Sequence, residues 1–196
     1  MVDDEAPTRT RLLQAAVEVM AESGWSAVTS RLVAERARAN NALVHYHFGT
    51  IDALRRAAVL HAMEKELEGP VGAVLRADDA LDGVQSAIRR LAARGSGAAG
   101  QRVLAEALMH GLRDAELHEE GVRRIRTFRD ALTDRLSENQ AAGRLRADAD
   151  PAALAVVIGA LLNGLLLHVL FDPGIDVVRS TAGLIALLRP ADPADL

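Results

Sequence analysis

The stretch VTSRLVAERARANNALVHYHFGTIDAL, residues 28–54, decides the fold of this 196-residue chain. It contains two short helical patterns. Leu32, Val33 and Ala37 face inward in the first, and Val44 and Phe48 lie one turn apart in the second. The joint between the two patterns is very short. Two short helices around a tight turn form a helix-turn-helix, whose second helix can lie in the major groove of DNA.

Polar residues mark the helix starts and the outer face of this motif. Thr29 or Ser30 caps the first helix, and Asn40 caps the second, a role that suits Asn40 better than base reading. Because Val44 points inward, four residues of the second helix point outward: Asn41, Ala42, His45 and Tyr46. We expect this face to meet DNA.

The residue types suit two kinds of DNA contact. Asn41 can bind adenine through two hydrogen bonds, His45 can donate to a guanine edge, and Ala42 allows close approach or touches a thymine methyl group. Phosphate contacts fix position without reading bases, and they suit another set: Thr29, Ser30, Tyr46, His47 and the helix amides after Thr50. Arg31 can serve in either way.

The motif resembles the DNA-binding domain of the tetracycline-repressor-like (TetR) family of regulators. The resemblance covers residues 8–56 and rests on the capping Thr29, the amphipathic LVAERA, the ending LVHYHFG, and a following helix with an acidic first turn and Leu54. It implies DNA contacts at five positions: Thr29, Arg31, Asn41, Tyr46 and His47.

Two positions depart from the family pattern. Arg38 stands where the turn favours glycine, so either this arginine adopts the turn geometry at some cost or the turn is rebuilt. Ile51 stands where the family often has a lysine, which puts one phosphate contact in doubt unless Thr50 or the helix amides replace it.

The charge distribution supports DNA binding although the average charge does not. The net charge of −4 by itself argues against a nucleic-acid partner. Residues 8–56, however, carry seven arginines and four acidic residues, a net charge of +3, whereas residues 1–7 carry −3 and residues 57–196 carry −4.

The absence of cysteine excludes disulfides, thiolate zinc sites and cysteine nucleophiles.

The composition predicts an all-α chain of about nine helices, because helix formers abound and aromatic residues make up only 3%. We expect a three-helix DNA-binding domain at 8–56, a helical effector-binding and dimerisation domain at 57–190, and flexible tails at 1–7 and 191–196. Thr8 is expected to cap the first helix, and Gly69-Pro70 to kink or end the fourth. Later helices are expected from Asp78 or Asp79 to Leu91 and at 101–112, 116–142, 151–171 and 176–188, with a loop at 95–100.

The segment 152–171 is apolar on all sides and long enough to raise a membrane span. Asn163 and His168 inside it, and acidic residues at its ends, oppose that interpretation, and the acidic N-terminus does not resemble a signal peptide. We therefore expect a cytoplasmic protein in which this helix is covered by a partner subunit or by the chain's own core. The residues predicted to form a dimer interface are Val156, Gly159, Ala160, Gly164, Val178, Leu184 and Ile185.

The family resemblance further implies an effector pocket among the middle helices. Its candidate lining residues, each equally well explained as core, are Met63, Leu67, Leu91, Leu104, Leu108, Met109, His110, Phe128, Asn163, Leu167 and His168. Mostly aliphatic walls favour a lipophilic small molecule. The cluster of Arg123, Arg124, Arg126 and Arg129 fits a solvated helix face better than an anion site.

These observations predict a homodimeric transcriptional repressor that binds a pseudopalindromic operator and is released by an effector. An enzyme is disfavoured because the chain has no P-loop and no HExxH motif, and we expect no cofactor, metal or catalytic residue. Two weak metal candidates exist, His118-Glu119-Glu120 and the pair Glu106 and His110. The remaining alternative is a helical ligand-binding or enzymatic module that does not bind DNA.

Overall fold

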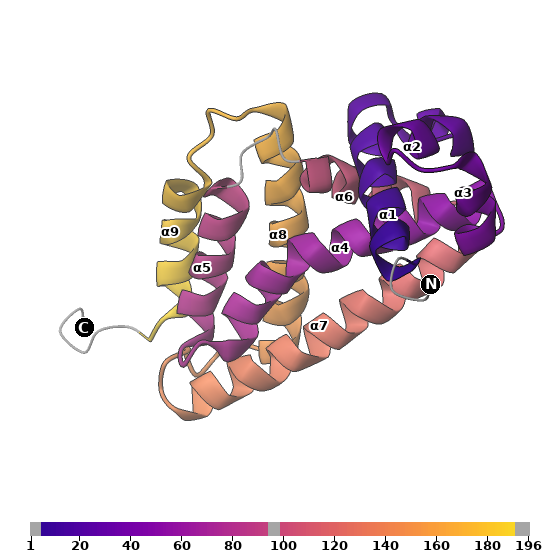
Figure 1. The fold of residues 1–196 in the computed structure, drawn as a ribbon. Coiled ribbons are helices and arrows are strands. Elements are labelled where there is room, and N and C mark those ends of the chain that lie inside the picture. Colours follow the sequence, from indigo (N-terminus) through magenta and orange to yellow (C-terminus); the bar gives the residue numbers. More distant parts are fainter. Residues whose placement is uncertain (1–4, 94–98, 191–196) are drawn as a thin grey trace. The chain divides into compact units, whose positions relative to one another are not determined.

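The computed structural model describes residues 5–93 and 99–190, and this part of the chain forms nine α-helices and one 3-10 helix, with no strand (Figure 1). The predicted all-α fold is thus confirmed. Residues 1–4 of the tail predicted at 1–7, the tail predicted at 191–196 and most of the loop predicted at 95–100 lie outside the described residues. Residues 5–7 belong to α1, so the prediction of a tail there is wrong. The elements are α1 (Glu5–Ser23), η1 (Trp25–Ala27), α2 (Ser30–Arg36), α3 (Asn41–Phe48), α4 (Ile51–Arg76), α5 (Ala80–Ala93), α6 (Ala99–His110), α7 (Ala115–Ala141), α8 (Pro151–Phe171) and α9 (Val177–Leu188).

Acidic N-caps set the starts of the last two helices. Asp150 accepts hydrogen bonds from the backbone N–H groups of Ala152 (2.9 Å) and Ala153 (3.2 Å), with a proline in the first helical position. Asp176 caps α9 through the N–H of Arg179 at 2.9 Å. The predicted helix starts at 151 and near 176 are therefore confirmed.

Two predicted helix boundaries differ from the structure. Helix α1 begins at Glu5, so Thr8 does not cap it and instead lies inside the helix, only 5% exposed. Helix α4 does not end at Gly69-Pro70 but continues to Arg76. Pro70 and Val74 are buried, and this packing offsets the backbone hydrogen bond that the proline removes.

The described residues divide into two compact units, and the first comprises residues 5–66 and 99–117. Within it α1 contacts α2 and α6, and α2 contacts α3. Its apolar core gathers one side of each of these helices, including Leu12, Val33, Val44 and Val103. This core fixes the orientation of the helix-turn-helix.

The second unit comprises residues 67–93 and 118–190. In it α5 contacts α8 and α9, and Figure 1 shows α5 and α9 side by side. Leu81, Leu132, Ile158 and Ile185 are among the residues of its core.

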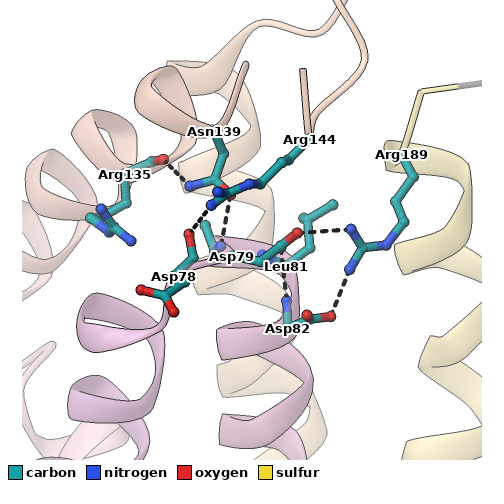
Figure 2. A network of polar contacts seen from close by, with 9 residues as sticks. Asp78, Asp79, Leu81, Asp82, Arg135, Asn139, Arg144 and Arg189 are labelled. Atoms are coloured by element: carbon teal, nitrogen blue, oxygen red, sulfur yellow. Dashed lines mark hydrogen bonds and ion pairs between the residues drawn. The ribbon is translucent and has the colours of Figure 1, made fainter. Parts of the chain in front are cut away.

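A polar network joins the start of α5 to the ends of α7 and α9 within the second unit (Figure 2). Asn139 of α7, 2% exposed, accepts a hydrogen bond from the backbone N–H of Ala80 (3.0 Å) and donates to the carbonyl of Arg135 (2.9 Å). Arg189, just after α9, binds Asp79 (2.9 Å) and Asp82 (2.6 Å). The side chain of Asn139 is therefore the buried cap of a neighbouring helix.

We expect Asn139→Ala to destabilise the protein by about 1–3 kcal/mol, because it leaves the buried N–H of Ala80 without an acceptor. Thermal unfolding followed by circular dichroism should show a Tm that is lower by roughly 2–10 °C. The control is Ser137→Ala, an exposed position on the same helix whose Tm should stay close to that of the parent. Equal Tm values for the two variants would contradict the capping role.

Candidate nucleic-acid interface

Helix α2 presents polar groups at its first turn. The backbone N–H of Leu32 donates to Thr29 Oγ1 at 3.3 Å, so Thr29, rather than Ser30, is the N-cap. Thr29 and Arg31 are exposed and Ser30 is half-buried. Leu32, predicted to face inward with Val33 and Ala37, is 36% exposed, so the prediction is wrong for this residue. A hydroxyl, a guanidinium and free helix amides together form a place where a phosphate group can bind.

The turn between α2 and α3 is closed by two backbone hydrogen bonds around Arg38. The N–H of Arg38 donates to Glu35 O (3.1 Å) and the N–H of Ala39 donates to Ala34 O (2.9 Å). Arg38 has φ of 51°. This pattern is a Schellman motif, which normally has glycine at the left-handed position. Of the two alternatives for this turn, the structure has the one in which arginine adopts the turn geometry.

Helix α3 turns one apolar side inward and one mixed side outward. Val44 is 1% exposed, whereas the four residues predicted to face outward are all exposed: Asn41, Ala42, His45 and Tyr46, the last at 70%. The N–H of Ala42 donates to Asn40 Oδ1 at 2.9 Å, so Asn40 is the helix cap that the sequence predicts. The outward face thus offers an amide, an imidazole and a phenol next to a small alanine.

The residues after α3 continue this surface. Thr50 is exposed, and its Oγ1 accepts from the N–H of Ala53 at 3.1 Å, which caps α4. His47 is half-buried, with its ring edge-on to Tyr46 at a centroid distance of 5.1 Å. Ile51 is partly buried against the first core, so an apolar side chain here contributes packing rather than a cation.

Two arginines hold the helix-turn-helix in place, and sequence reasoning did not single them out. Arg36 of α2 donates to both carboxylate oxygens of Glu22 on α1 at 2.8 and 2.7 Å, and this pairing lowers the pKa of Glu22. Arg55 of α4 donates to the carbonyl of Val28, directly before the α2 cap, at 2.8 and 3.1 Å. Only three-dimensional proximity reveals these contacts, because Arg55 and Val28 are 27 residues apart.

Helix α6 contacts the segment just before α2 through Trp25. The Trp25 ring stacks on His110 at a centroid distance of 4.4 Å. Glu106 lies one turn earlier, and burial raises its pKa. A hydrogen bond from the backbone of Trp25 and the charge of His110 lower this pKa, but by less than burial raises it. Glu106 Oε2 is buried without a hydrogen-bond partner among the described residues. Glu106 and His110 thus contact Trp25, and no cluster of three metal-ligating side chains is found in the described ranges.

The predicted effector residues fall into both units. Met63, Leu104, Leu108, Met109 and His110 belong to the first, and Leu67, Leu91, Phe128, Asn163, Leu167 and His168 to the second. Leu91 and Leu104 are buried, whereas Met109, Asn163 and His168 are exposed. An open surface pocket of about 280 Å³ is lined by other residues, among them Arg76 and Arg90. A second open pocket, of about 640 Å³, lies along α7 and the start of α8.

Helix α8 is long and apolar enough to cross a membrane, a test that core helices of soluble proteins also pass. Only 22% of the residues in its most apolar 18-residue stretch are buried, and the mean hydropathy of that stretch is 2.4. Of the predicted interface residues, Val156, Ala160, Val178 and Leu184 are exposed and Gly159 and Gly164 are half-buried. Ile185 is 2% exposed and lies in the core of the second unit.

Comparisons with known proteins agree with these features. Residues 12–58 match the model of the bacterial regulatory proteins of the tetR family, and residues 82–189 match that of the C-terminal domain of BetI-type transcriptional repressors. The HTH-type transcriptional regulator UidR of Escherichia coli K12 is 24% identical over 170 residues, which cover 85% of this chain and 83% of UidR.

Solved structures show the same fold. Salmonella enterica GusR superposes with a TM-score of 0.74 at 22% identity, covering 93% of this chain and 95% of GusR. A regulator from Saccharomonospora viridis in complex with choline superposes with a TM-score of 0.72 at 18% identity, covering 92% of this chain and 94% of its own. Because the two family models together span the helix-turn-helix and most of the later helices, the chain belongs to the TetR family of bacterial transcriptional regulators.

Proposed function

We propose that this regulator binds a pseudopalindromic DNA operator as a homodimer and represses transcription until an effector releases it. The observation that carries the proposal is the exposed outer face of α3, held by the buried Val44. One eight-residue helix offers too few base contacts for specific recognition in a genome, so two subunits would bind half-sites about one helical turn apart. Such a protein acts in the cytoplasm, where the DNA is.

We assign the residues of this surface to two roles. Asn41, Ala42 and His45 lie on the first turns of α3 and would read base edges. A second set would contact phosphate groups: Thr29, Ser30, Arg31, Tyr46, His47 and Thr50. Asn40 serves the interface as the cap that fixes the start of α3.

We expect Tyr46→Ala to abolish retardation of an operator fragment taken from near the gene of this protein. Because the ring is 70% exposed, the substitution should change folding stability by no more than about 1 kcal/mol. Electrophoretic mobility shift at low salt measures binding, and size-exclusion chromatography checks that the assembly is intact.

Asn41→Ala distinguishes base reading from phosphate contact on the same helix. It should weaken operator binding by about 1–3 kcal/mol but leave binding to unrelated DNA unchanged. Thr127→Ala, an exposed polar position on α7, serves as the control. Equal loss on operator and unrelated DNA would contradict a base contact, and full binding by Tyr46→Ala would contradict the proposed interface.

Dimerisation through α8 and α9 is supported by the apolar surface that these helices leave uncovered. Val156 and Val157 of α8 are 53% and 55% exposed, and Leu187 of α9 is 68% exposed. A Cβ atom placed on Gly159 or Gly164 would meet nothing within 4 Å, so a partner helix has room to approach closely. An apolar surface of this kind is typical of a protein interface.

We expect Val157→Asp to convert the dimer into a monomer, because it would bury an unpaired carboxylate in the interface. Size-exclusion chromatography with light scattering should report half the parent mass, and specific operator binding should be lost with it. Leu112→Asp, at a 71% exposed leucine in the first unit, is the matched control and should remain dimeric. A dimeric Val157→Asp protein would rule out this interface.

The response to an effector would pass through the contact of α6 with Trp25. Trp25 lies four residues before the α2 cap Thr29, so a displacement of Glu106 or His110 would move the segment that positions α2. An effector can act in this way only by binding one arrangement of α6 more tightly than the other. A lipophilic small molecule remains the proposed class. The complex of the Saccharomonospora viridis regulator with choline supports the coarser proposal of a small organic ligand.

We expect Glu106→Gln to stabilise the protein at pH 8 and to have a smaller effect at pH 5. The pKa of Glu106 is higher in the folded state than in the unfolded state. Below the unfolded-state pKa the carboxyl is protonated in both states and does not lower the folding stability. The protein loses stability as the pH rises through the folded-state pKa, because the buried carboxyl then becomes charged. The uncharged amide avoids this loss. Thermal unfolding at the two pH values measures the difference, and a Tm gain that is the same at both would contradict the buried-carboxylate explanation.

A further inference from the structure

Arg38 is a strained residue in an exposed turn. Among the described residues it is the only non-glycine with a positive φ, 51°. Its own N–H and that of Ala39 close the Schellman turn, so the turn itself requires this conformation. Glycine adopts it without strain, whereas arginine does not.

Nothing within the described part of the chain offsets this strain through the Arg38 side chain. The side chain is exposed and forms no ion pair there. Neighbouring arginines behave differently: Arg36 binds Glu22, Arg55 binds Asp52, and Arg56 binds Asp114. A cation already lies at the end of α2, because Arg36 is in the last turn of this helix.

The position of Arg38 indicates what its charge is for. It lies two residues before the cap Asn40 and three before Asn41, the first residue of α3. In helix-turn-helix proteins the first residues of the second helix reach the base edges, so the preceding turn lies near the rim of the groove, where the phosphate groups run. A long, planar guanidinium there can bind a phosphate through two hydrogen bonds.

We propose that Arg38 is a phosphate anchor, whose exposed guanidinium in the left-handed turn binds the DNA backbone beside the first residue of α3. This inference rests on the proposed role of α3 in operator binding and adds a contact that the family's usual glycine cannot make. Arg38 thus lowers the folding stability through its backbone conformation and raises the affinity for DNA through its side chain.

Three substitutions at Arg38 separate backbone strain from charge. Arg38→Gly should raise the Tm by about 2–4 °C but weaken operator binding. Each dimer loses two phosphate contacts, so the slope of log K against log salt should fall by about 1.8 in magnitude. The ratio of the parent's affinity to that of the glycine variant should therefore shrink roughly tenfold between 50 and 200 mM salt. Arg38→Lys should keep the parent's slope and Tm. Arg38→Asn, neutral and tolerant of positive φ, should bind with the same slope as the glycine variant.

The control is Arg126→Gln, which removes one exposed charge from α7 and should leave the salt slope unchanged. An Arg38→Gly protein with the parent's slope would overturn the phosphate contact, and one with a lower Tm would overturn the strain argument. If the parent binds the operator and Tyr46→Ala does not, the proposed function stands. An unchanged salt slope for Arg38→Gly would then contradict only the phosphate contact of Arg38. If the parent does not retard DNA at low salt, the proposed function fails and this inference fails with it.

Discussion

The burial of Val44 is the contact on which the proposed DNA-binding surface depends. Helix α3 has eight residues, too few to be stable as an isolated helix, so its geometry comes from packing and caps. Val44 packs into the first core, Asn40 fixes the first turn, and Gly49 ends the helix at a φ of 71°. The outward direction of Asn41, Ala42, His45 and Tyr46 follows from these three constraints and from helical periodicity alone.

Much of this arrangement could be predicted from the sequence because its causes are local. Caps such as Asn40, Asp150 and Asp176 act on helices that begin within one or two residues of them, so the starts of α3, α8 and α9 were predicted correctly. The prediction that Thr8 is an N-cap was wrong because it, too, used only local sequence. A threonine in the sequence does not by itself reveal whether it precedes a helix or lies inside one. The continuation of α4 past Pro70 depends on burial that no local pattern reveals.

The contacts that could not be predicted join residues far apart in the chain. Arg55 and Val28 are 27 residues apart, and Asn139 and Ala80 are 59 apart. Periodicity identifies a polar residue on a helix but not the backbone group that it reaches. For Ile185, apolar character suited an interface and a core equally well, and only the fold places it in the second core.

Formal charge overstates the positive charge that the DNA-binding unit offers to a partner. Of the seven arginines in residues 8–56, three form ion pairs within the first unit: Arg36 with Glu22 of α1, Arg55 with Asp52 of its own helix, and Arg56 with Asp114 before α7. The charge of these three is therefore partly neutralised inside the protein. Arg9 stacks over Phe48, with its guanidinium carbon 5.2 Å from the ring centroid. Arg31 and Arg38 form no ion pair in the described residues, and they lie at the start of α2 and in the turn between α2 and α3. The field that a phosphate group would meet therefore depends on where these few arginines lie more than on the net charge of the whole chain.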